Sequence, residues 1–251
     1  MLIRRVIPCL DCRDGRVVKG VNFAALREVG SPVECAGTYE AQGADEIVLL
    51  DISATPQGRE HHLQTVRDVR DVLSIPLTVG GGVRSVENVR VLLEAGADKV
   101  AVNSAAVDDP SLIDELAGRF GCQCTVLAVD AARNHDGHWC VVVQSGRKRT
   151  GLDAVAWSRE GVQRGAGEIL LTSWDRDGTR SGYDLQLLAA VSRAVTVPVI
   201  ASGGASCPEH LLEALQAGAD AVLAASIFHE AEYSVADVKN CLARSGIEVR
   251  R

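Results

Sequence analysis

The two halves of this chain carry diverged copies of one sequence. QGADEIVLLD, which begins at Gln42, returns as RGAGEILLTS, which begins at Arg164. The pairs TVGGGV/IASGGA and EAGADKVAVNSAA/QAGADAVLAASIF share the same offset of 122 residues, about half of the 251-residue chain and too long for a solenoid repeat. The duplication predicts either two small domains or one larger domain closed from two halves, about 1–121 and 122–251.

Short apolar runs alternate with amphipathic segments along the whole chain. Runs with both faces apolar are typical of parallel strands covered by helices; they are Ile3–Leu10, Ile47–Leu50, Pro76–Val79, Lys99–Val102, Cys124–Val129, Glu168–Thr172, Val197–Ala201 and Ala221–Ala225. Eight βα units at this length predict a single (β/α)8 TIM barrel domain, with an open doubly wound sheet as the alternative. The tandem repeat favours the barrel, because two four-unit halves close without edge strands.

The sequence also indicates where helices begin and end and where long loops lie. Ser31-Pro32-Val33-Glu34 predicts a capping box, Ser85 a second helix start, and Gly43, Gly96 and Gly218 helix ends. Two connections, Cys12–Gly30 and Ala131–Gly151, are longer than the rest and hold equivalent places in the two halves. We expect both to act as lids or clamps over a substrate, the second as a small hairpin.

Functional residues of a barrel lie at the carboxyl ends of its strands. The polar residues at or just past these ends are Asp11, Asp51, Asn103, Asp130, Thr172, Asp177 and Ser202. Asp11 and Asp130 hold equivalent places in the two halves. Because two carboxylates in different environments can divide into proton donor and acceptor, we predict general acid–base catalysis by this pair. No Ser/His/Asp or Cys/His nucleophilic set is apparent at the strand ends.

Glycine clusters follow a strand in each half. Their backbone N–H groups can approach an anion closely, and an Asn-Ser or Ala-Ser segment follows one unit later. The residues concerned are Gly81 and Gly82 with Asn103 and Ser104, and Gly203 and Gly204 with Ala225 and Ser226. Two such sites predict a small-molecule substrate that carries a phosphate at each end.

Four strands start with a charged residue that the two-residue period points into the barrel. They are Arg5, Glu46, Lys99 and Glu168. One interpretation is a neutral ring across the bottom of the barrel, since buried charges persist only when paired. The other is four solvent-exposed surface charges. The alternation of side chains along a strand does not by itself favour either interpretation.

Composition excludes several classes of function. The net charge of −7 comes without a basic cluster, so we expect neither nucleic acid nor a membrane surface as partner. With no leader-like segment and no apolar stretch of about 20 residues, we expect a cytoplasmic protein. The closest cysteine pairs, Cys9/Cys12 and Cys122/Cys124, lack histidines at zinc spacing, and His135 and His138 fall in a polar turn. We therefore predict reduced thiols, no metal and no cofactor.

Several segments together resemble a known family. RRVIPCLDCRDGRVVKGVNF, ADEIVLLDI, TVGGGVRS, GADKVAVNSAAV, RGAGEILLTSWDRDGTRSGYD and IASGGA are similar to the cyclase subunits of imidazole glycerol phosphate synthase, from histidine biosynthesis, over residues 2 to about 250. KGVNF and DRDGTRSGYD distinguish these cyclases from the sister isomerase that acts one step earlier.

The resemblance implies a lyase and cyclase activity. Ammonia would convert the bisphosphorylated ribulosyl aminoimidazole carboxamide intermediate into imidazole glycerol phosphate and aminoimidazole carboxamide ribotide. Asp11 and Asp130 match the family's acid–base pair, and Lys19 matches a residue on the mobile first loop. The positions that match the surroundings of the two phosphates are Gly82, Asn103, Asp177, Gly178, Gly204 and Ser226.

The resemblance also implies a protein partner. A glutaminase subunit would dock at the barrel bottom as a heterodimer and supply ammonia through a gate that matches Arg5, Glu46, Lys99 and Glu168; Asp98 and Gln123 match interface positions. The chain departs from the family's pattern at Cys12, Ser53, Thr55, Ala101 and Ala132. The alternatives are the sister isomerase, an enzyme with both activities, and a non-catalytic phosphate-binding barrel that activates a glutaminase.

Overall fold

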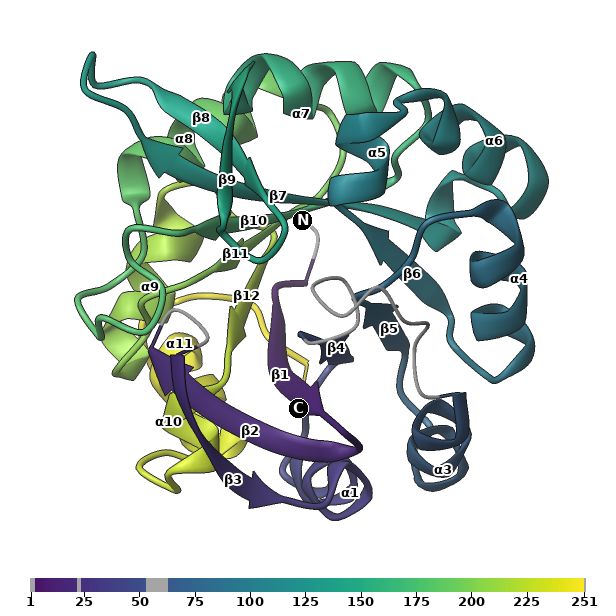
Figure 1. Cartoon of the computed structure of the whole chain (residues 1–251). Helices are drawn as coiled ribbons and strands as arrows, with labels where there is room; N and C mark the ends of the chain where they lie inside the picture. Colours follow the sequence, from purple (N-terminus) through teal and green to yellow (C-terminus); the bar gives the residue numbers. More distant parts are fainter. Residues whose placement is uncertain (1–2, 22–23, 53–62, 251) are drawn as a thin grey trace.

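Eight parallel strands close into a barrel (Figure 1). The computed structural model describes residues 3–21, 24–52 and 63–250, with the side chains of 20, 21 and 24–26 excepted. Each barrel strand is hydrogen-bonded to two neighbours, and β12 pairs with β1 to close the circle. The barrel strands are β1 (Arg5–Arg13), β4 (Ile47–Asp51), β5 (Leu77–Gly80), β6 (Lys99–Val102), β7 (Thr125–Arg133), β10 (Glu168–Ser173), β11 (Val199–Ser202) and β12 (Ala221–Ala224). The predicted (β/α)8 barrel is confirmed, and the open sheet is wrong.

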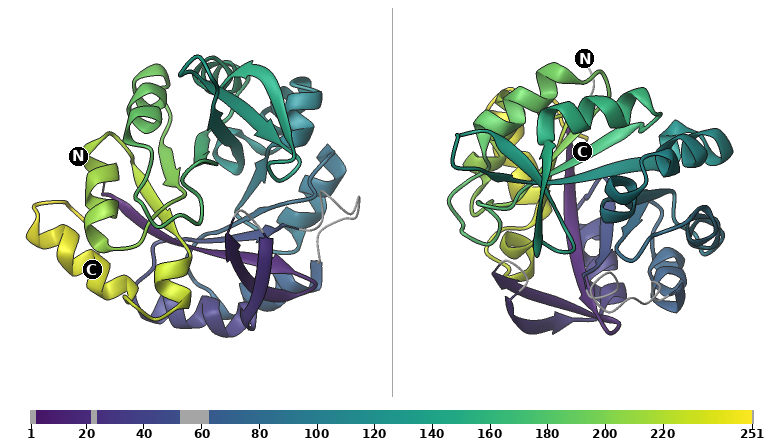
Figure 2. Two further views of the ribbon diagram at one scale, coloured as in Figure 1. Left: turned by 60° about the vertical axis from the view of Figure 1, so that its left-hand side comes forward. Right: turned by 45° about the horizontal axis from the view of Figure 1, so that its top comes forward.

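Helices surround the strands on the outside (Figure 2). Over the described residues, no helix is both long and apolar enough to cross a membrane. The helices are α1 (Pro32–Ala41), α3 (Leu63–Val72), α4 (Val86–Glu94), α6 (Ser111–Phe120), α7 (Ala154–Gln163), α8 (Leu185–Ala194), α9 (Pro208–Gln216) and α11 (Val235–Arg244), with the shorter α5 (Ser104–Asp108), η1 (Cys122–Cys124) and α10 (Ser226–His229).

The core has two parts, one on each face of the strands. The larger part lies between strands and helices and contains Leu49, Leu77 and Trp157. The smaller part fills the barrel interior and consists of Ile7, Cys9, Val48, Ala101, Val126, Leu170, Ile200, Ala221 and Leu223. Because successive side chains of a strand point to opposite faces, a strand buried on both sides needs apolar residues throughout. The inward positions of Ile7 and Cys9 agree with the predicted parity.

Both long connections form β-hairpins. β2 (Arg16–Val21) and β3 (Ala24–Gly30) extend β1, while β8 (Trp139–Val143) and β9 (Lys148–Asp153) extend β7. The second hairpin was predicted; the strands of the first were not. They add to the first and fifth strands of the barrel, so both project beyond the carboxyl ends of the barrel strands.

The two predicted serine caps differ. Ser85 Oγ accepts a hydrogen bond from the backbone N–H of Asn88, as predicted. The capping box at Ser31 is wrong, since its side chain makes no cap hydrogen bond within the described structure. Instead Pro32 occupies the first turn, and the carbonyl oxygen of Ser31 accepts from the Cys35 N–H at 3.1 Å. The fixed φ of proline is already suited to a helix start, so the helix forms there without the hydroxyl.

We expect Ser85→Ala to lower the free energy of unfolding by about 1 kcal/mol, the usual cost of an N-cap side chain. Ser31→Ala should lower it by no more than a few tenths, because that hydroxyl caps nothing in α1. Urea denaturation of the two variants measures the difference. Equal losses would contradict the assignment of these two helix starts.

Candidate active site

A cavity of about 820 Å³ opens at the carboxyl ends of the barrel strands. Its volume lies within the range of small-molecule sites. Every residue that the sequence proposes for acid–base chemistry or phosphate binding lines it: Asp11, Lys19, Asp51, Gly81, Gly82, Asn103, Ser104, Asp130, Thr172, Asp177, Gly178, Ser202, Gly203, Gly204, Ala225 and Ser226. Residues from all eight barrel strands or the loops after them therefore face one space.

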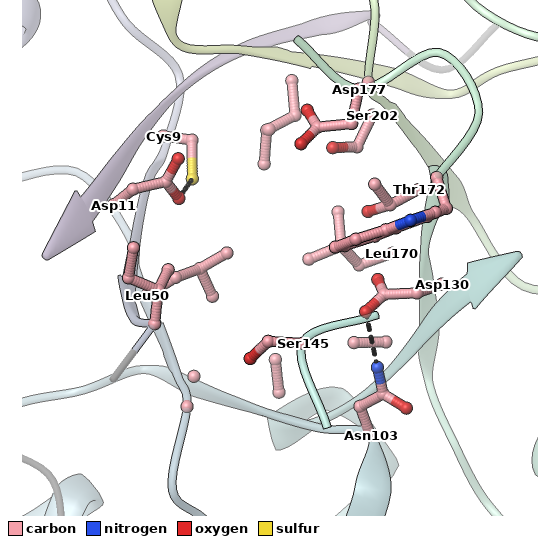
Figure 3. Close-up of a pocket in the computed structure, with 18 of the residues that line it drawn as sticks. Cys9, Asp11, Leu50, Asn103, Asp130, Ser145, Leu170, Thr172, Asp177 and Ser202 are labelled. Atoms are coloured by element: carbon pink, nitrogen blue, oxygen red, sulfur yellow. Dashed lines mark hydrogen bonds between the residues drawn. The ribbon is translucent and has the colours of Figure 1, made fainter. Parts of the chain in front are cut away.

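Asp11 and Asp130 lie on opposite sides of this cavity (Figure 3). Asp11 is in β1, and its Oδ2 lies 4.0 Å from Lys19 Nζ of β2. Its Oδ1 accepts a hydrogen bond from Cys9 Sγ at 3.4 Å. Burial, and next the Asp11 carboxylate, raise the pKa of Cys9, so the thiol keeps the proton that it donates. A cation and a thiol donor thus surround Asp11.

Asp130 of β7 has different surroundings. Burial raises its pKa from 3.8 to about 7, and the negative charge of Asp177 adds to this effect. Hydrogen bonds from Thr172 and Asn103 act in the opposite direction, the latter between Asn103 Nδ2 and Asp130 Oδ2 at 2.9 Å. A carboxyl group with a pKa near 7 can accept or release a proton at neutral pH. The two aspartates therefore offer different surroundings to a molecule held between them.

The raised pKa of Asp130 also predicts a pH effect on stability. The native state holds this proton more tightly than the unfolded chain does, so the stabilisation is present at about pH 4 and is lost as pH rises through 7. We expect Asp130→Asn, which stays neutral, to raise the free energy of unfolding by about 4 kcal/mol at pH 8 and by less than about 1 kcal/mol at pH 4. Urea denaturation at both pH values, with the exposed-turn variant Asp136→Asn as control, measures this. An equal gain at both pH values would contradict the raised pKa.

The first glycine pair lies beside the β5 end of the cavity. Gly81 and Gly82 have φ values of 92° and 70°, and a Cβ on Gly81 would overlap the backbone of Asp51. Only glycine fits this close approach, which leaves the backbone open toward the cavity. Ser104 lies nearby in the lining, and its Oγ accepts a hydrogen bond from the Gln144 N–H at 2.9 Å. The tip of the β8–β9 hairpin therefore closes over this side.

The second glycine pair follows β11. Gly203 and Gly204 have φ values of 93° and 100°, and a Cβ on Gly204 would overlap the carbonyl oxygen of Gly182. Gly178 and Ser226 line the same cavity. The lining also contains three arginines that the sequence analysis did not propose, Arg84, Arg147 and Arg180. Glycine backbone at two places and cationic side chains at the rim suit a molecule with two anionic groups.

The four charged strand starts contact one another at the amino-terminal end of the barrel. Arg5 Nη1 lies 2.8 Å from Glu46 Oε2, and the other guanidinium nitrogen pairs with Glu168. Lys99 Nζ lies 2.8 Å from Glu46 Oε2 and 2.8 Å from Glu168 Oε2. Thr78 Oγ1 donates to the other oxygen of Glu46 at 2.6 Å. Of the two interpretations, the structure has the closed ring of alternating charge.

The two residues proposed for a partner interface lie at the same end as this ring. Asp98 precedes β6, and its Oδ2 accepts from Arg70 Nη1 at 3.0 Å and from the Leu77 N–H at 2.8 Å. Gln123 precedes β7 in η1 and is exposed. Both side chains therefore belong to the face opposite the cavity.

Comparison with known proteins adds the family. The model of a family described as "Histidine biosynthesis protein" matches residues 5–234. The chain belongs to this family. Its members are barrel enzymes of histidine biosynthesis, and a match to it does not separate the cyclase from the isomerase.

For this member of the histidine biosynthesis family, sequence reasoning missed part of the cavity wall. Ser145 and Arg147 at the β8–β9 tip and Trp174 after β10 line the cavity, and Figure 3 shows Ser145 facing it on the side of Asn103. The predicted clamp function of Ala131–Gly151 was the available signal, but it named no residue. Among the departures from the family's pattern, Ala132 is buried outside the lining, and Ser53 and Thr55 lie outside the described residues, as do Asn22 and Phe23 of KGVNF.

Proposed function

We propose that this chain is the cyclase subunit of imidazole glycerol phosphate synthase. In this reaction the bisphosphorylated ribulosyl intermediate takes up ammonia, loses water and divides into imidazole glycerol phosphate and aminoimidazole carboxamide ribotide. The proposal is supported by an acid–base pair on opposite sides of one cavity and by a glycine pair at each of two places in its wall. The two phosphates would anchor the ends of the substrate, which leaves its reacting middle between Asp11 and Asp130.

The charged ring at the opposite end of the barrel favours the cyclase over the isomerase. An isomerase has one small-molecule reactant and needs one entrance. A cyclase that receives ammonia from a partner needs a second entrance that admits ammonia and excludes bulk water. Glu46 and Glu168 are nearly fully buried, while Arg5 and Lys99 reach the amino-terminal surface. This ring is the single observation that carries the choice between the two activities.

The aspartates would divide the proton transfers. Ring closure and cleavage of a carbon–nitrogen bond require both the removal and the delivery of protons. Asp130, with a pKa near 7, can exchange a proton with bound substrate at neutral pH. Asp11 faces the reacting middle of the substrate from the opposite side, 4.0 Å from the Lys19 ammonium, and would act as the second acid–base group.

We also propose a glutaminase as heterodimer partner, docked on the face that carries Asp98 and Gln123. The exposure of both residues and their place beside the ring support this surface. A partner seated there would release ammonia directly below Glu46, Lys99 and the apolar residues of the barrel interior above them.

The assay that tests the proposal supplies the purified chain with the ribulosyl intermediate and an ammonium salt. We expect formation of the two products, and no comparable isomerisation of the preceding ribosyl compound. Isomerisation without ammonia-dependent product would identify the sister isomerase. Neither activity, together with stimulation of a glutaminase, would identify a non-catalytic barrel.

A further inference from the structure

Trp174 is the only aromatic residue in the cavity wall among the residues that the structure describes. It follows β10 by one residue and lies two positions past Thr172, which hydrogen-bonds Asp130. Its backbone N–H donates to the carbonyl oxygen of Ala131 at 2.8 Å. Because Ala131 is the neighbour of Asp130 in β7, this hydrogen bond holds Trp174 on the Asp130 side of the cavity.

The indole of Trp174 is held from the side of the β8–β9 hairpin. A Cβ added to Gly146 would overlap the indole ring, so the ring lies directly on the backbone of this glycine. Gln144, Ser145 and Gly146 all have positive φ values, of 57°, 55° and 79°, which curl the hairpin tip. The tip is also tied to Ser104 by the hydrogen bond from the Gln144 N–H. The ring therefore has a fixed support, and it is half-buried, with part of its surface in the cavity.

We propose that Trp174 is the platform on which the planar aminoimidazole carboxamide ring of the ligand stacks. This inference rests on the proposed function, which supplies a ligand with such a ring. The heterocycle of the ligand has two apolar faces and polar edges. An indole supported from one side offers a flat apolar surface to one of these faces. Stacking of this kind recognises the heterocycle and not the phosphates, so Trp174 determines specificity for the aromatic part of the ligand.

The test compares two probes that differ in the heterocycle. Aminoimidazole carboxamide ribotide carries the ring and one phosphate, whereas glycerol 3-phosphate carries a phosphate without a ring. We expect Trp174→Ala to weaken binding of the ribotide by roughly tenfold or more, the usual loss on removing a stacking partner, and binding of glycerol phosphate by less than about twofold. Trp174→Phe should keep most of the ribotide affinity. Calorimetry gives both affinities, and their ratio is the measured quantity.

Trp139→Ala separates stacking from support of the hairpin, because it removes an indole from β8 and leaves the contact between Gly146 and Trp174 unchanged. This substitution should change both affinities alike and keep their ratio. A ratio lowered equally by Trp139→Ala and Trp174→Ala would overturn the proposal, as would a ratio unchanged in Trp174→Ala. Intrinsic fluorescence is a second readout, because the ribotide should quench it in the Trp139→Phe variant and not in Trp174→Phe. Trp139 is a suitable control, since it lies outside the cavity lining and its Nε1–H donates a hydrogen bond to Asp184 Oδ2.

The two proposals fail in different ways. If the chain is not a cyclase, ammonia-dependent product is absent while the affinity ratio still depends on Trp174, because the isomerase ligand carries the same heterocycle. If stacking is wrong, the cyclase is active and the ratio does not depend on Trp174.

Discussion

Asp11→Asn should lower ammonia-dependent turnover by about a hundredfold or more and leave KM for the ribulosyl substrate nearly unchanged. The substitution keeps the size of the side chain and removes its capacity to exchange a proton. The glycine pairs at Gly81 and Gly203 follow other strands, β5 and β11, so phosphate anchoring should persist. Steady-state kinetics with saturating ammonium salt measures both constants. Near-normal turnover would remove Asp11 from the mechanism.

The matched variant Asp130→Asn should lower ammonia-dependent turnover by a similar factor. The pH profiles of the Asp11 and Asp130 variants distinguish the functions of the two residues. Since the pKa of Asp130 is about 7, turnover of the wild type should change with pH near neutrality. If Asp130 donates a proton, turnover falls as pH rises through 7; if it accepts one, turnover falls as pH drops through 7. Any residual turnover of Asp11→Asn should keep this dependence on pH. Asp136→Asn, on the exposed turn between β7 and β8, serves as control and should behave like the wild type.

Lys99→Ala should lower glutamine-dependent turnover by about thirtyfold in the complex with a glutaminase, a coupling loss of about 2 kcal/mol. Turnover with added ammonium salt should change by less than about threefold, because dissolved ammonia can reach Asp11 and Asp130 through the open cavity. The physical reason lies in the ring. Arg5 contacts both glutamates through two nitrogens, whereas Lys99 contacts both through a single nitrogen atom. Lys99 can therefore move while Arg5 still pairs with Glu46 and Glu168. Displacing Lys99 should cost less free energy than displacing any other member of the ring.

A same-end control keeps this second prediction specific. Arg4 pairs with Asp220 at the amino-terminal end of the barrel but is not part of the ring. Arg4→Ala should leave the ratio of glutamine-dependent to ammonia-dependent turnover unchanged. If Lys99→Ala alters both activities to the same extent, the ring has no part in ammonia passage.

Some of the site could be predicted only in part, and the reasons are specific. The parity of a strand predicts that Glu46 and Lys99 point inward, but it does not say whether their side chains reach one another across the barrel. That depends on the relative heights of strands that are far apart in sequence. Likewise Ser31 and Ser85 look equivalent as helix starts, yet only the second caps, because Pro32 already determines the first turn of α1.

The raised pKa of Asp130 and the place of Trp174 in the cavity wall could not be predicted from the sequence, and the reason is the same for both. The raised pKa follows from burial and from Asp177, which a different strand and loop supply. Trp174 becomes part of the cavity wall because Gly146, from a separate hairpin, lies against its indole. The sequence by itself determined the alternation of strands and helices, the polar strand ends and the glycine pairs, because periodicity and turn chemistry act over a few residues. Only the tertiary structure decided the charged ring, the proton affinity of Asp130 and the support of Trp174, because each arises from atoms brought together across the barrel.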